Sequence, residues 1–299
     1  MKRRRAIKLV ILGVIGVSIW VVFALRLHRT AGPCTRLNDP AMLPDIPEAS
    51  GLAVSRRDTG VIWSHNDSGH ESLLFALDPM GNLLGKVRVP IHVMDWEDVS
   101  VGRCPDGAAC LYIADIGDNR FGRRNILIYR VPEPAPGDSE TAAPDVFSAK
   151  YEDGPHNAEA MFVLGEDLFV ITRDRTGHLY RSLPPMPDRR EMTLQHVGQL
   201  DLGVVTDAEA SPDEKSVVVR TSHEVVFYRA VDLTRGKILP YLRIPIDGMK
   251  ESQGEGVAMD GNGMLYLASE GRPWNRSGRL LSLQCKMPHA PFDDPSDRQ

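Results

Sequence analysis

A repeat of about 48 residues is the feature of this sequence that most constrains its fold. Five short segments each lead from an acidic or polar residue into an apolar strand, and they start at Ser50, Glu97, Glu159, Asp207 and Glu255. Successive starts lie 47, 62, 48 and 48 residues apart. The long interval contains a proline-rich stretch, residues 131–146, which is typical of a surface loop.

Each start is followed by a turn and by further apolar strands. The second strands are GVIWSHND, CLYIADIGD, DLFVITRD, SVVVRTS and MLYLASEG, and the third are LLFALD, ILIYRV, HLYRSL, EVVFYRA and RLLSLQ. Repeats of this length built from short strands indicate propeller blades, which must stack around an axis because one blade cannot bury both of its faces. We therefore predict an all-β chain with a β-propeller over residues 48–290. Five blades fit the repeats, and six are the alternative. A sandwich of unrelated hairpins would leave the regular spacing unexplained.

The N-terminus predicts a membrane anchor. The basic segment MKRRRAIK, residues 1–8, precedes 17 uncharged residues, 9–25. As a helix this run covers about 25 Å, just enough to span the hydrocarbon of a bilayer, and the basic cluster favours a cytoplasmic N-terminus. We predict an uncleaved signal-anchor at 9–25, a linker and possible closing strand at 26–47, and a disordered tail at 291–299. The alternatives are a cleaved signal peptide, for which no small-residue cleavage site follows residue 25, and a lipoprotein, for which Pro33 before Cys34 is unsuited.

The four cysteines predict two disulfides, because an even number beyond an export segment is typical of an oxidising compartment. Cys104 and Cys110 flank a Pro-Asp-Gly turn signal and are expected to pair across a hairpin. That leaves Cys34 with Cys285, a bond that would close the ring. The alternatives are four reduced cysteines or metal ligation, although no CxxC spacing supports the latter.

Polar residues at the strand ends predict one acidic face. In a propeller blade the innermost strand starts, and the second strand ends, on the same side of the disc. The first-strand starts contribute Glu48, Ser50, Glu97, Asp98, Glu159, Asp207 and Glu255, and the second-strand ends contribute His65, Asn66, Asp67, Asp115, Asp118, Asn119, Arg173, Asp174, Arg220 and Glu270. Because carboxylates so close together repel, some must be protonated, paired or bound to a cation, and only Arg173 and Arg220 stand out as balancing cations.

Carboxylate and amide oxygens of this kind suit Ca²⁺. The predicted metal ligands are Glu97, Glu159, Asp207, Glu255, Asp67 and Asp115. In the alternative interpretation the same carboxylates cap turns and pair between blades. Zinc is less favoured, because His65, His156 and His223 lack a compact ligand spacing. Glu159, His65 and His156 are candidate acid–base residues, of which Glu159 and His65 are favoured, and no GxSxG nucleophile motif is present.

Four motifs carry a resemblance to known propellers: DWEDVSV, LYIADIGDN, HNAEAM and QGEGVAM. With them the chain resembles bacterial envelope β-propellers of uncertain function. More distantly it resembles phytase-like and SMP-30-type propellers, calcium-associated folds that include phosphoesterases and lactone hydrolases. The resemblance covers residues 48 to about 285 and implies a metal at the channel mouth, with Glu97, Glu159 and Glu255 the counterparts of channel acids. Two features depart from the phytase and SMP-30 types: five repeats in place of six blades, and few Lys or Arg for a polyphosphate substrate.

Two functions follow as hypotheses. The net charge of −5 and the lack of a basic stripe after residue 30 argue against a nucleic-acid partner. The first hypothesis is a single-pass protein of the bacterial cell membrane whose extracytoplasmic propeller binds a small molecule or an envelope protein at an acidic, Ca²⁺-loaded mouth. The second is a metal-dependent hydrolase of a small ester, lactone or phosphoester. Binding is favoured because the sequence contains no recognisable motif for a nucleophile or a general base.

The predicted orientation can be tested with a fusion. A reporter that is active only in the cytoplasm, joined after Gln299, should be silent, because the anchor would hold the propeller outside. A strong cytoplasmic signal would reverse the assignment.

Overall fold

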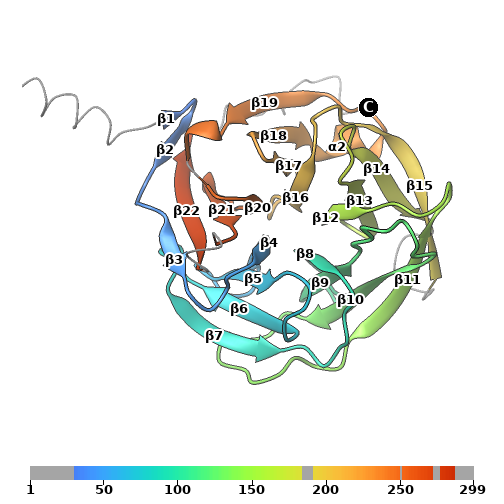
Figure 1. Cartoon of the computed structure of the whole chain (residues 1–299), viewed down its shortest axis with the longest axis horizontal. Coiled ribbons are helices and arrows are strands. Elements are labelled where there is room, and N and C mark those ends of the chain that lie inside the picture. The colour runs from blue at the N-terminus through green and yellow to red at the C-terminus, as the bar shows by residue number, and fades with distance from the viewer. Residues whose placement is uncertain (1–29, 184–190, 250, 272–276, 287–299) are drawn as a thin grey trace, which may run out of the picture.

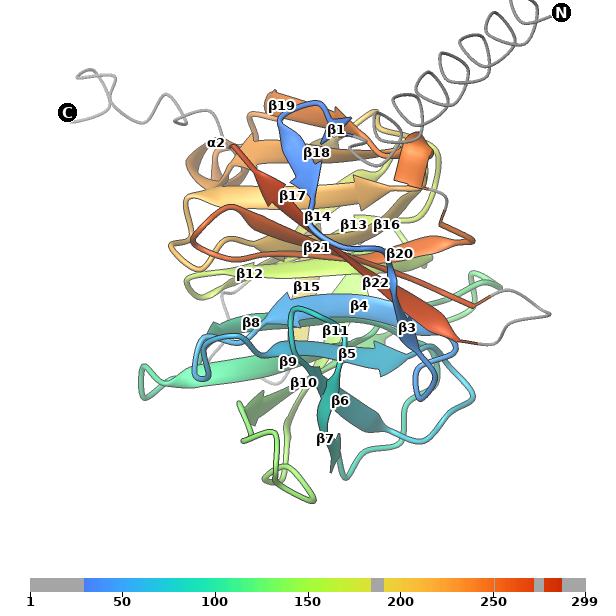
Figure 2. The same cartoon turned by 90° about the vertical axis from the view of Figure 1, so that its left-hand side faces the viewer.

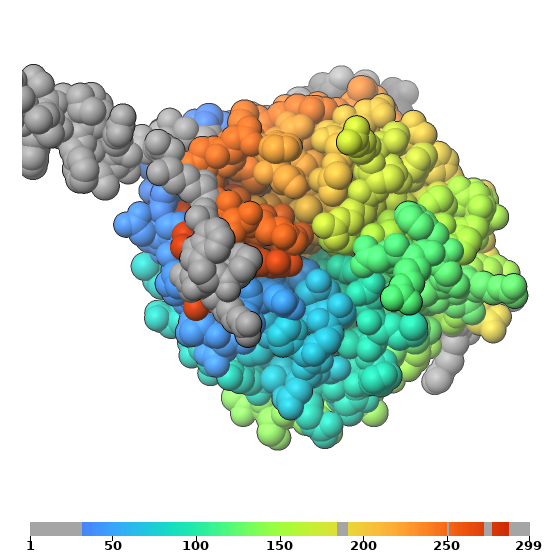
Figure 3. Space-filling model, viewed as in Figure 1, coloured from blue at the N-terminus to red at the C-terminus, as the bar shows by residue number. Residues whose placement is uncertain are grey.

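In the computed structural model the described residues, 30–183, 191–249, 251–271 and 277–286, form an all-β structure. The sheets follow one another in chain order around a common centre (Figure 1). The same order is visible from blue through green to red on the surface shown in Figure 3. Among these described residues, helix is limited to α2 (Ala230–Thr234) and the 3₁₀ turn η1 (Asp247–Met249). The predicted anchor at 9–25 lies outside the described residues, and no helix within them is long and apolar enough to cross a membrane.

The strands pair mainly with their neighbours in sequence. The first sheet contains β4 (Ala49–Val54), β5 (Ile62–Asn66), β6 (Leu73–Leu77) and β7 (Leu83–Arg88). An eight-stranded sheet contains β8 (Trp96–Arg103), β9 (Ala109–Asp115), β10 (Ile126–Pro132) and β11 (Asp145–Tyr151), followed by β12 (Ala158–Leu164), β13 (Asp167–Thr172), β14 (His178–Leu183) and β15 (Glu191–Gln199). Its two antiparallel halves are joined only by the parallel pairing of β11 with β15.

The next sheet contains β16 (Val205–Ala210), β17 (Ser216–Thr221), β18 (Glu224–Arg229) and β19 (Pro240–Pro245). The last contains β20 (Gly254–Met259), β21 (Met264–Ser269) and β22 (Gly278–Cys285), and the N-terminal strands β1 (Thr30–Ala31), β2 (Cys34–Arg36) and β3 (Ala41–Leu43) complete it. The described residues therefore form five antiparallel units, each with its own innermost strand: β4, β8, β12, β16 or β20.

Each unit has a fourth, outer strand where the sequence motif predicted three. Strand β7 shows why, because most of its residues are partly or fully exposed and only Val87 is buried. A strand without a buried face gives no alternating apolar pattern to detect. In the last unit β2 takes the outer place, pairing antiparallel with β22 (Figure 1). Strand β3 pairs with the other end of β22 (Figure 2).

The N-terminal and C-terminal ends of the described chain are joined at this sheet. The pairing of β2 with β22 sets Cys34 opposite Cys285, with Cα atoms 3.9 Å apart, and a disulfide links them. The second disulfide joins Cys104 and Cys110 across the turn between β8 and β9. Both predicted disulfides are confirmed.

The proline-rich insertion covers an exposed sheet edge. The backbone N–H of Arg88 in β7 donates to the carbonyl of Ser139 at 3.1 Å, and Thr141 N–H donates to the Arg88 carbonyl at 2.9 Å. Gly85 has no side chain where one would strike the carbonyl of Pro136. The predicted loop thus shields the unpaired backbone of an outer strand, which is a known protection against edge-to-edge association.

The seam between the first and last sheets is sealed by apolar packing. Leu52 and Ile62 from the first sheet share a buried cluster with Ala258, Tyr266 and Leu280 from the last. Closure of the ring therefore depends on this cluster as well as on the disulfide.

The two disulfides should contribute unequally to stability. Replacing Cys34 and Cys285 by Ser should lower the free energy of unfolding by up to about 5 kcal/mol, because that bond closes a loop of 251 residues. Replacing Cys104 and Cys110, which are 6 residues apart, should cost about 2 kcal/mol on the same model. Urea unfolding of both double variants measures the difference. Equal losses would contradict a special role for ring closure.

Candidate functional site

The innermost strands share an irregularity near their start. In each unit the pairing with the second strand slips at the same place, between Ala49 and Leu52, Trp96 and Asp98, Ala158 and Ala160, Val205 and Asp207, and Gly254 and Val257. A bulge releases a residue from the ladder and re-aims its side chain. The released positions hold Ser50, Glu97, Glu159, Thr206 and Glu255. Three of the predicted channel acids therefore occupy equivalent places.

Asp207, the fourth acid that was predicted at this position, is not equivalent to the other three. It follows the bulge, where its counterpart in β8 is Asp98. Both aspartates are fully buried. The Asp207 carboxylate accepts the backbone N–H groups of Ala208, Leu52 and Val257. Its oxygens are thus engaged by the backbone, so Asp207 lies outside the group of carboxylates available to a metal at the mouth.

Asp98 and Asp207 form a hydrogen-bonded pair. Asp98 accepts the N–H of Met161 at 2.7 Å, and the two carboxyl groups also bond to each other. Burial raises the pKa of Asp207 to about 7 and that of Asp98 well above its ordinary value. The pair therefore retains a proton near neutral pH. Gly51 makes room for it, because a Cβ there would strike the Asp98 carboxylate.

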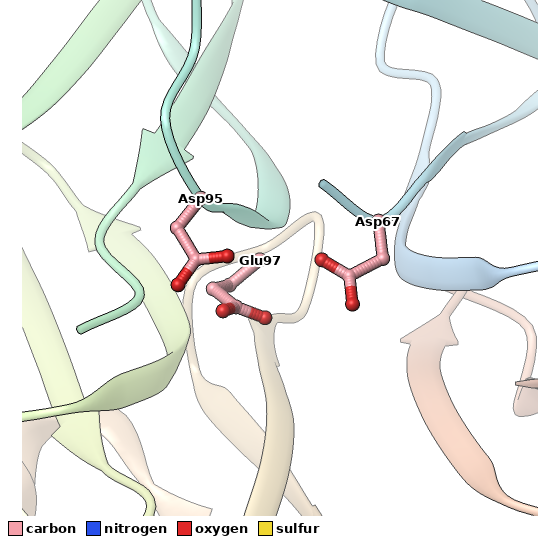
Figure 4. Close-up of side chains that lie close together, drawn as sticks. All are labelled: Asp67, Asp95 and Glu97. Carbon is pink, nitrogen blue, oxygen red and sulfur yellow. The ribbon is translucent and has the colours of Figure 1, made fainter. Parts of the chain in front are cut away.

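Three carboxylates lie close together on the face of the ring where the innermost strands begin, which we call the acidic mouth. They are Asp67, Asp95 and Glu97, with one oxygen of each within 4.8 Å of the others (Figure 4). Asp67 follows β5, while Asp95 and Glu97 flank the first residue of β8. Gly117, just beyond β9, touches the group closely, since a Cβ there would collide with both Glu97 and Asp95. Asp67 and Glu97 were predicted ligands. Asp95 was missed, although it stands in the DWED motif two residues before Glu97.

Glu97 is the least compensated of the three. It is only 4% exposed, and within the described part of the chain its carboxylate has no hydrogen bond or ion pair. Burial raises the pKa of Glu97 well above the usual range, and the neighbouring Glu159, Asp67 and Asp95 raise it further. Burial also raises the pKa of Asp67. A carboxyl group in this position must hold a proton or face a cation.

Glu159 and Glu255 line the same mouth but have partners. The Arg173 guanidinium donates to the Glu159 carboxylate, yet burial still raises the pKa of Glu159 to about 8. Gln253 Nε2 donates to Glu255 Oε1 at 2.8 Å, and burial raises the pKa of Glu255 too. These two predicted ligands therefore flank the cluster of three.

Asp115 contacts the loop that carries Asp95. Its fully buried carboxylate forms an ion pair of 2.8 Å with Arg123 and accepts the N–H groups of Asp95 at 2.9 Å and Met94 at 3.2 Å. With these contacts it orients the loop that carries Asp95. Its predicted role as a metal ligand is not supported, because its oxygens are already bound.

Arg220 makes its direct contacts with residues near the last unit. It is fully buried, pairs with Glu251 at 2.6 Å and donates to the carbonyls of Gly256 and Ala268. It was expected to balance the mouth carboxylates, and its charge does partly offset the rise that burial causes in the pKa of Glu255. Arg173 remains as the guanidinium bound directly to a mouth carboxylate in the described chain.

His65 lies below the cluster and is fully buried. Its ring stacks on Trp96, with centroids 4.2 Å apart and planes at 11°, and Nδ1 meets the Asn66 carbonyl at 2.8 Å. Burial lowers the pKa of His65 to about 3, so the ring is neutral. This burial argues against the predicted acid–base role. The stack instead holds the strands that carry Asp67 and Glu97 against each other.

Comparison with known proteins supports the fold and no family. No family model matches the chain, and no curated protein matches it. It is similar to the PQQ-bound aldose sugar dehydrogenase from Streptomyces coelicolor, at 13% identity over 84% of this chain and 97% of that one, with a TM-score of 0.50. A glucose dehydrogenase matches at 11% identity over 83% and 98% of the two chains, with a TM-score of 0.48. The first similarity shows a β-propeller fold and does not single out the phytase-like or SMP-30-type propellers.

The protonated carboxyls should make the metal-free protein less stable as the pH rises. Asp207 and Glu159 have folded pKa values of about 7 and about 8, against ordinary values of 3.8 and 4.5. In the unfolded chain they release their protons at lower pH, so their contribution is complete near pH 4 and is lost as the pH rises through 7 to 8. His65 acts in the opposite sense only below 6.5. The melting temperature of the metal-free protein, measured in chelator, should therefore be lower at about pH 9 than at about pH 7. A flat or rising profile would contradict the buried protons.

Proposed function

We propose that this protein is a five-bladed β-propeller that is anchored in the bacterial cell membrane by residues 9–25 and binds its ligand outside the cytoplasm through a calcium ion at the acidic mouth. Each antiparallel unit is one blade, and β2 completes the last. The two disulfides are consistent with an oxidising compartment. The apolar run ends only a few residues before β1, so the anchor would hold the propeller close to the membrane.

One observation carries the proposal. Asp67, Asp95 and Glu97 bring carboxylate oxygens within 4.8 Å of one another, and the Glu97 carboxylate lacks a partner among the described residues. Ca²⁺ takes six to eight oxygen ligands, so three carboxylates would leave positions for water and for oxygens of a ligand. The ligand is therefore a small molecule or an envelope protein that offers carboxylate, hydroxyl or carbonyl oxygens.

Hydrolysis is the second candidate, and Glu159 favours it. Burial raises the pKa of Glu159 in the metal-free protein, and a bound cation would ionise it, which suits a general base beside a metal that polarises a carbonyl. Ester, lactone and phosphoester substrates offered with and without Ca²⁺ separate the candidates. Calcium-dependent turnover that Glu159→Gln removes would establish the hydrolase, and absence of turnover would leave the binding module.

Similarity in fold does not bring the cofactor of the sugar dehydrogenase to this mouth. PQQ is a quinone with three carboxylates, and it would need cationic side chains or the calcium ion itself as partners. The described mouth offers the Arg173 guanidinium, already bound to Glu159, among the carboxylates of Asp67, Asp95 and Glu97. We therefore assign no dehydrogenase chemistry to this chain.

Calcium should stabilise the protein through Glu97. At 100 times its dissociation constant, an ion that binds only the folded state adds about 2.7 kcal/mol to the free energy of unfolding. Glu97→Gln should abolish this gain and leave the metal-free protein at least as stable, because it removes a buried carboxyl that must otherwise stay protonated. The matched variant Glu159→Gln should retain the gain but lower stability with or without calcium, since it breaks the pair with Arg173. Thermal melting with Ca²⁺ or chelator measures both, and a wild-type curve indifferent to calcium would rule out the ion.

A further inference from the structure

A second group of potential ligands lies on the outer strands of the third antiparallel unit. His178 is the first residue of β14, and His196 lies in the neighbouring β15. The two rings face each other, with Nδ1 of His178 3.1 Å from Nε2 of His196. Mouth residues such as Glu159 belong to innermost strands, so this pair is a separate feature.

The spacing of the two nitrogens matches that of ligands on one metal ion. Imidazole nitrogens bind Zn²⁺ at about 2.0–2.1 Å, so two adjacent ligands lie about 2.9 Å apart at a right angle and about 3.3 Å apart in a tetrahedron. The observed 3.1 Å falls between these values. Both side chains are accessible enough for an ion to enter, since that of His178 is 26% exposed and His196 is exposed.

Neighbouring carboxylates suit a bound cation. Oδ2 of Asp174, which already accepts the Thr172 hydroxyl at 2.5 Å, lies 3.9 Å from Nε2 of His178; this is beyond hydrogen-bond distance but places a negative charge beside the ring. Metal-bound histidines usually direct their second nitrogen to a carboxylate, which fixes the tautomer and raises basicity. On the other side, Glu152 Oε1 accepts the backbone N–H of His196 at 2.9 Å.

A third nearby histidine, His156, already has hydrogen-bond partners. Nε2 of His156 lies 2.9 Å from Asp153 Oδ1 and 2.9 Å from the Tyr180 hydroxyl. The protein would therefore supply two nitrogen ligands, and water would complete the coordination.

We propose that His178 and His196 bind a divalent transition-metal ion, zinc or copper, at a site distinct from the acidic mouth. Imidazole favours borderline ions, whereas the carboxylates of the mouth favour hard ions such as Ca²⁺. The two places therefore select different metals. This inference does not depend on the function proposed above.

The test uses the full-length protein without a histidine tag, stripped with chelator and then saturated with Ca²⁺ so that the mouth does not compete. Titration calorimetry with Zn²⁺ should show one ion per chain. His178→Ala and His196→Ala should each weaken binding at least tenfold, because a single imidazole remains. Asp174→Asn should weaken it less than either histidine change, because it removes only a negative charge 3.9 Å from His178. His223→Ala is the matched control, since His223 is an exposed histidine 2.7 Å from Asp247 in another unit, and it should bind like the wild type.

Copper gives an independent readout. The electron paramagnetic resonance spectrum of the Cu²⁺-loaded protein should show hyperfine coupling to two nitrogens, and His196→Gln should reduce it to one. Metal-free melting curves confirm that the variants are folded. If both alanine variants bind Zn²⁺ like the wild type, or if the copper spectrum lacks two nitrogens, the facing rings are only a hydrogen-bonded pair and the proposal is wrong.

Discussion

The hydrogen-bonded pair of Asp98 and Asp207 links all five innermost strands. Asp98 in β8 accepts an amide of β12, and Asp207 in β16 accepts amides of both β20 and β4. The two carboxyls complete the link across the axis by bonding to each other. Sheets arranged in a ring otherwise contact mainly their neighbours, so these two side chains, together with Glu209 of β16 and its hydrogen bonds to β8, connect strands across it. Hydrogen bonds to charged groups contribute about 1.5–3 kcal/mol each, but a buried carboxyl pair retains that gain only while it holds a proton.

The acidic mouth follows from this arrangement. The axis below it offers carboxyls in place of cations, and deeper still Glu209 accepts a hydrogen bond of 2.6 Å from Ser100 and has a pKa raised by burial to about 8. Among the described residues, Arg173 and the buried charge of Arg220 near Glu255 act on the mouth carboxylates. The remaining compensation must come from protons or from an ion that enters at the surface. Arg173 is bound to Glu159, so Glu97 depends on a proton or on a bound ion for its compensation.

The sequence predicted the innermost strands better than the side chains that they place at the centre. Spacing alone located all five innermost strands, and turn chemistry with cysteine count located both disulfides. The error at Asp207 has a simple physical cause: a shift of one residue moves a side chain to the other face of a strand, and the bulge that decides the phase leaves no mark in the spacing. Asp115 and Arg220 were placed near the correct rim, but their partners Arg123 and Glu251 depend on loops that no periodic pattern describes. Asp95 precedes its strand and was missed for the same reason.

Protons and calcium would compete for the same mouth. An ion at Asp67, Asp95 and Glu97 would favour the charged form of each nearby carboxyl, including Glu159, because an opposite charge lowers a carboxyl pKa. Calcium would therefore displace protons as it binds, and its affinity would rise with pH. The ion would also supply at high pH the compensation that protons supply at low pH. On this argument the alkaline loss of stability belongs largely to the metal-free protein, except for the share of the buried Asp98 and Asp207 pair, whose oxygens are held by backbone amides and by each other.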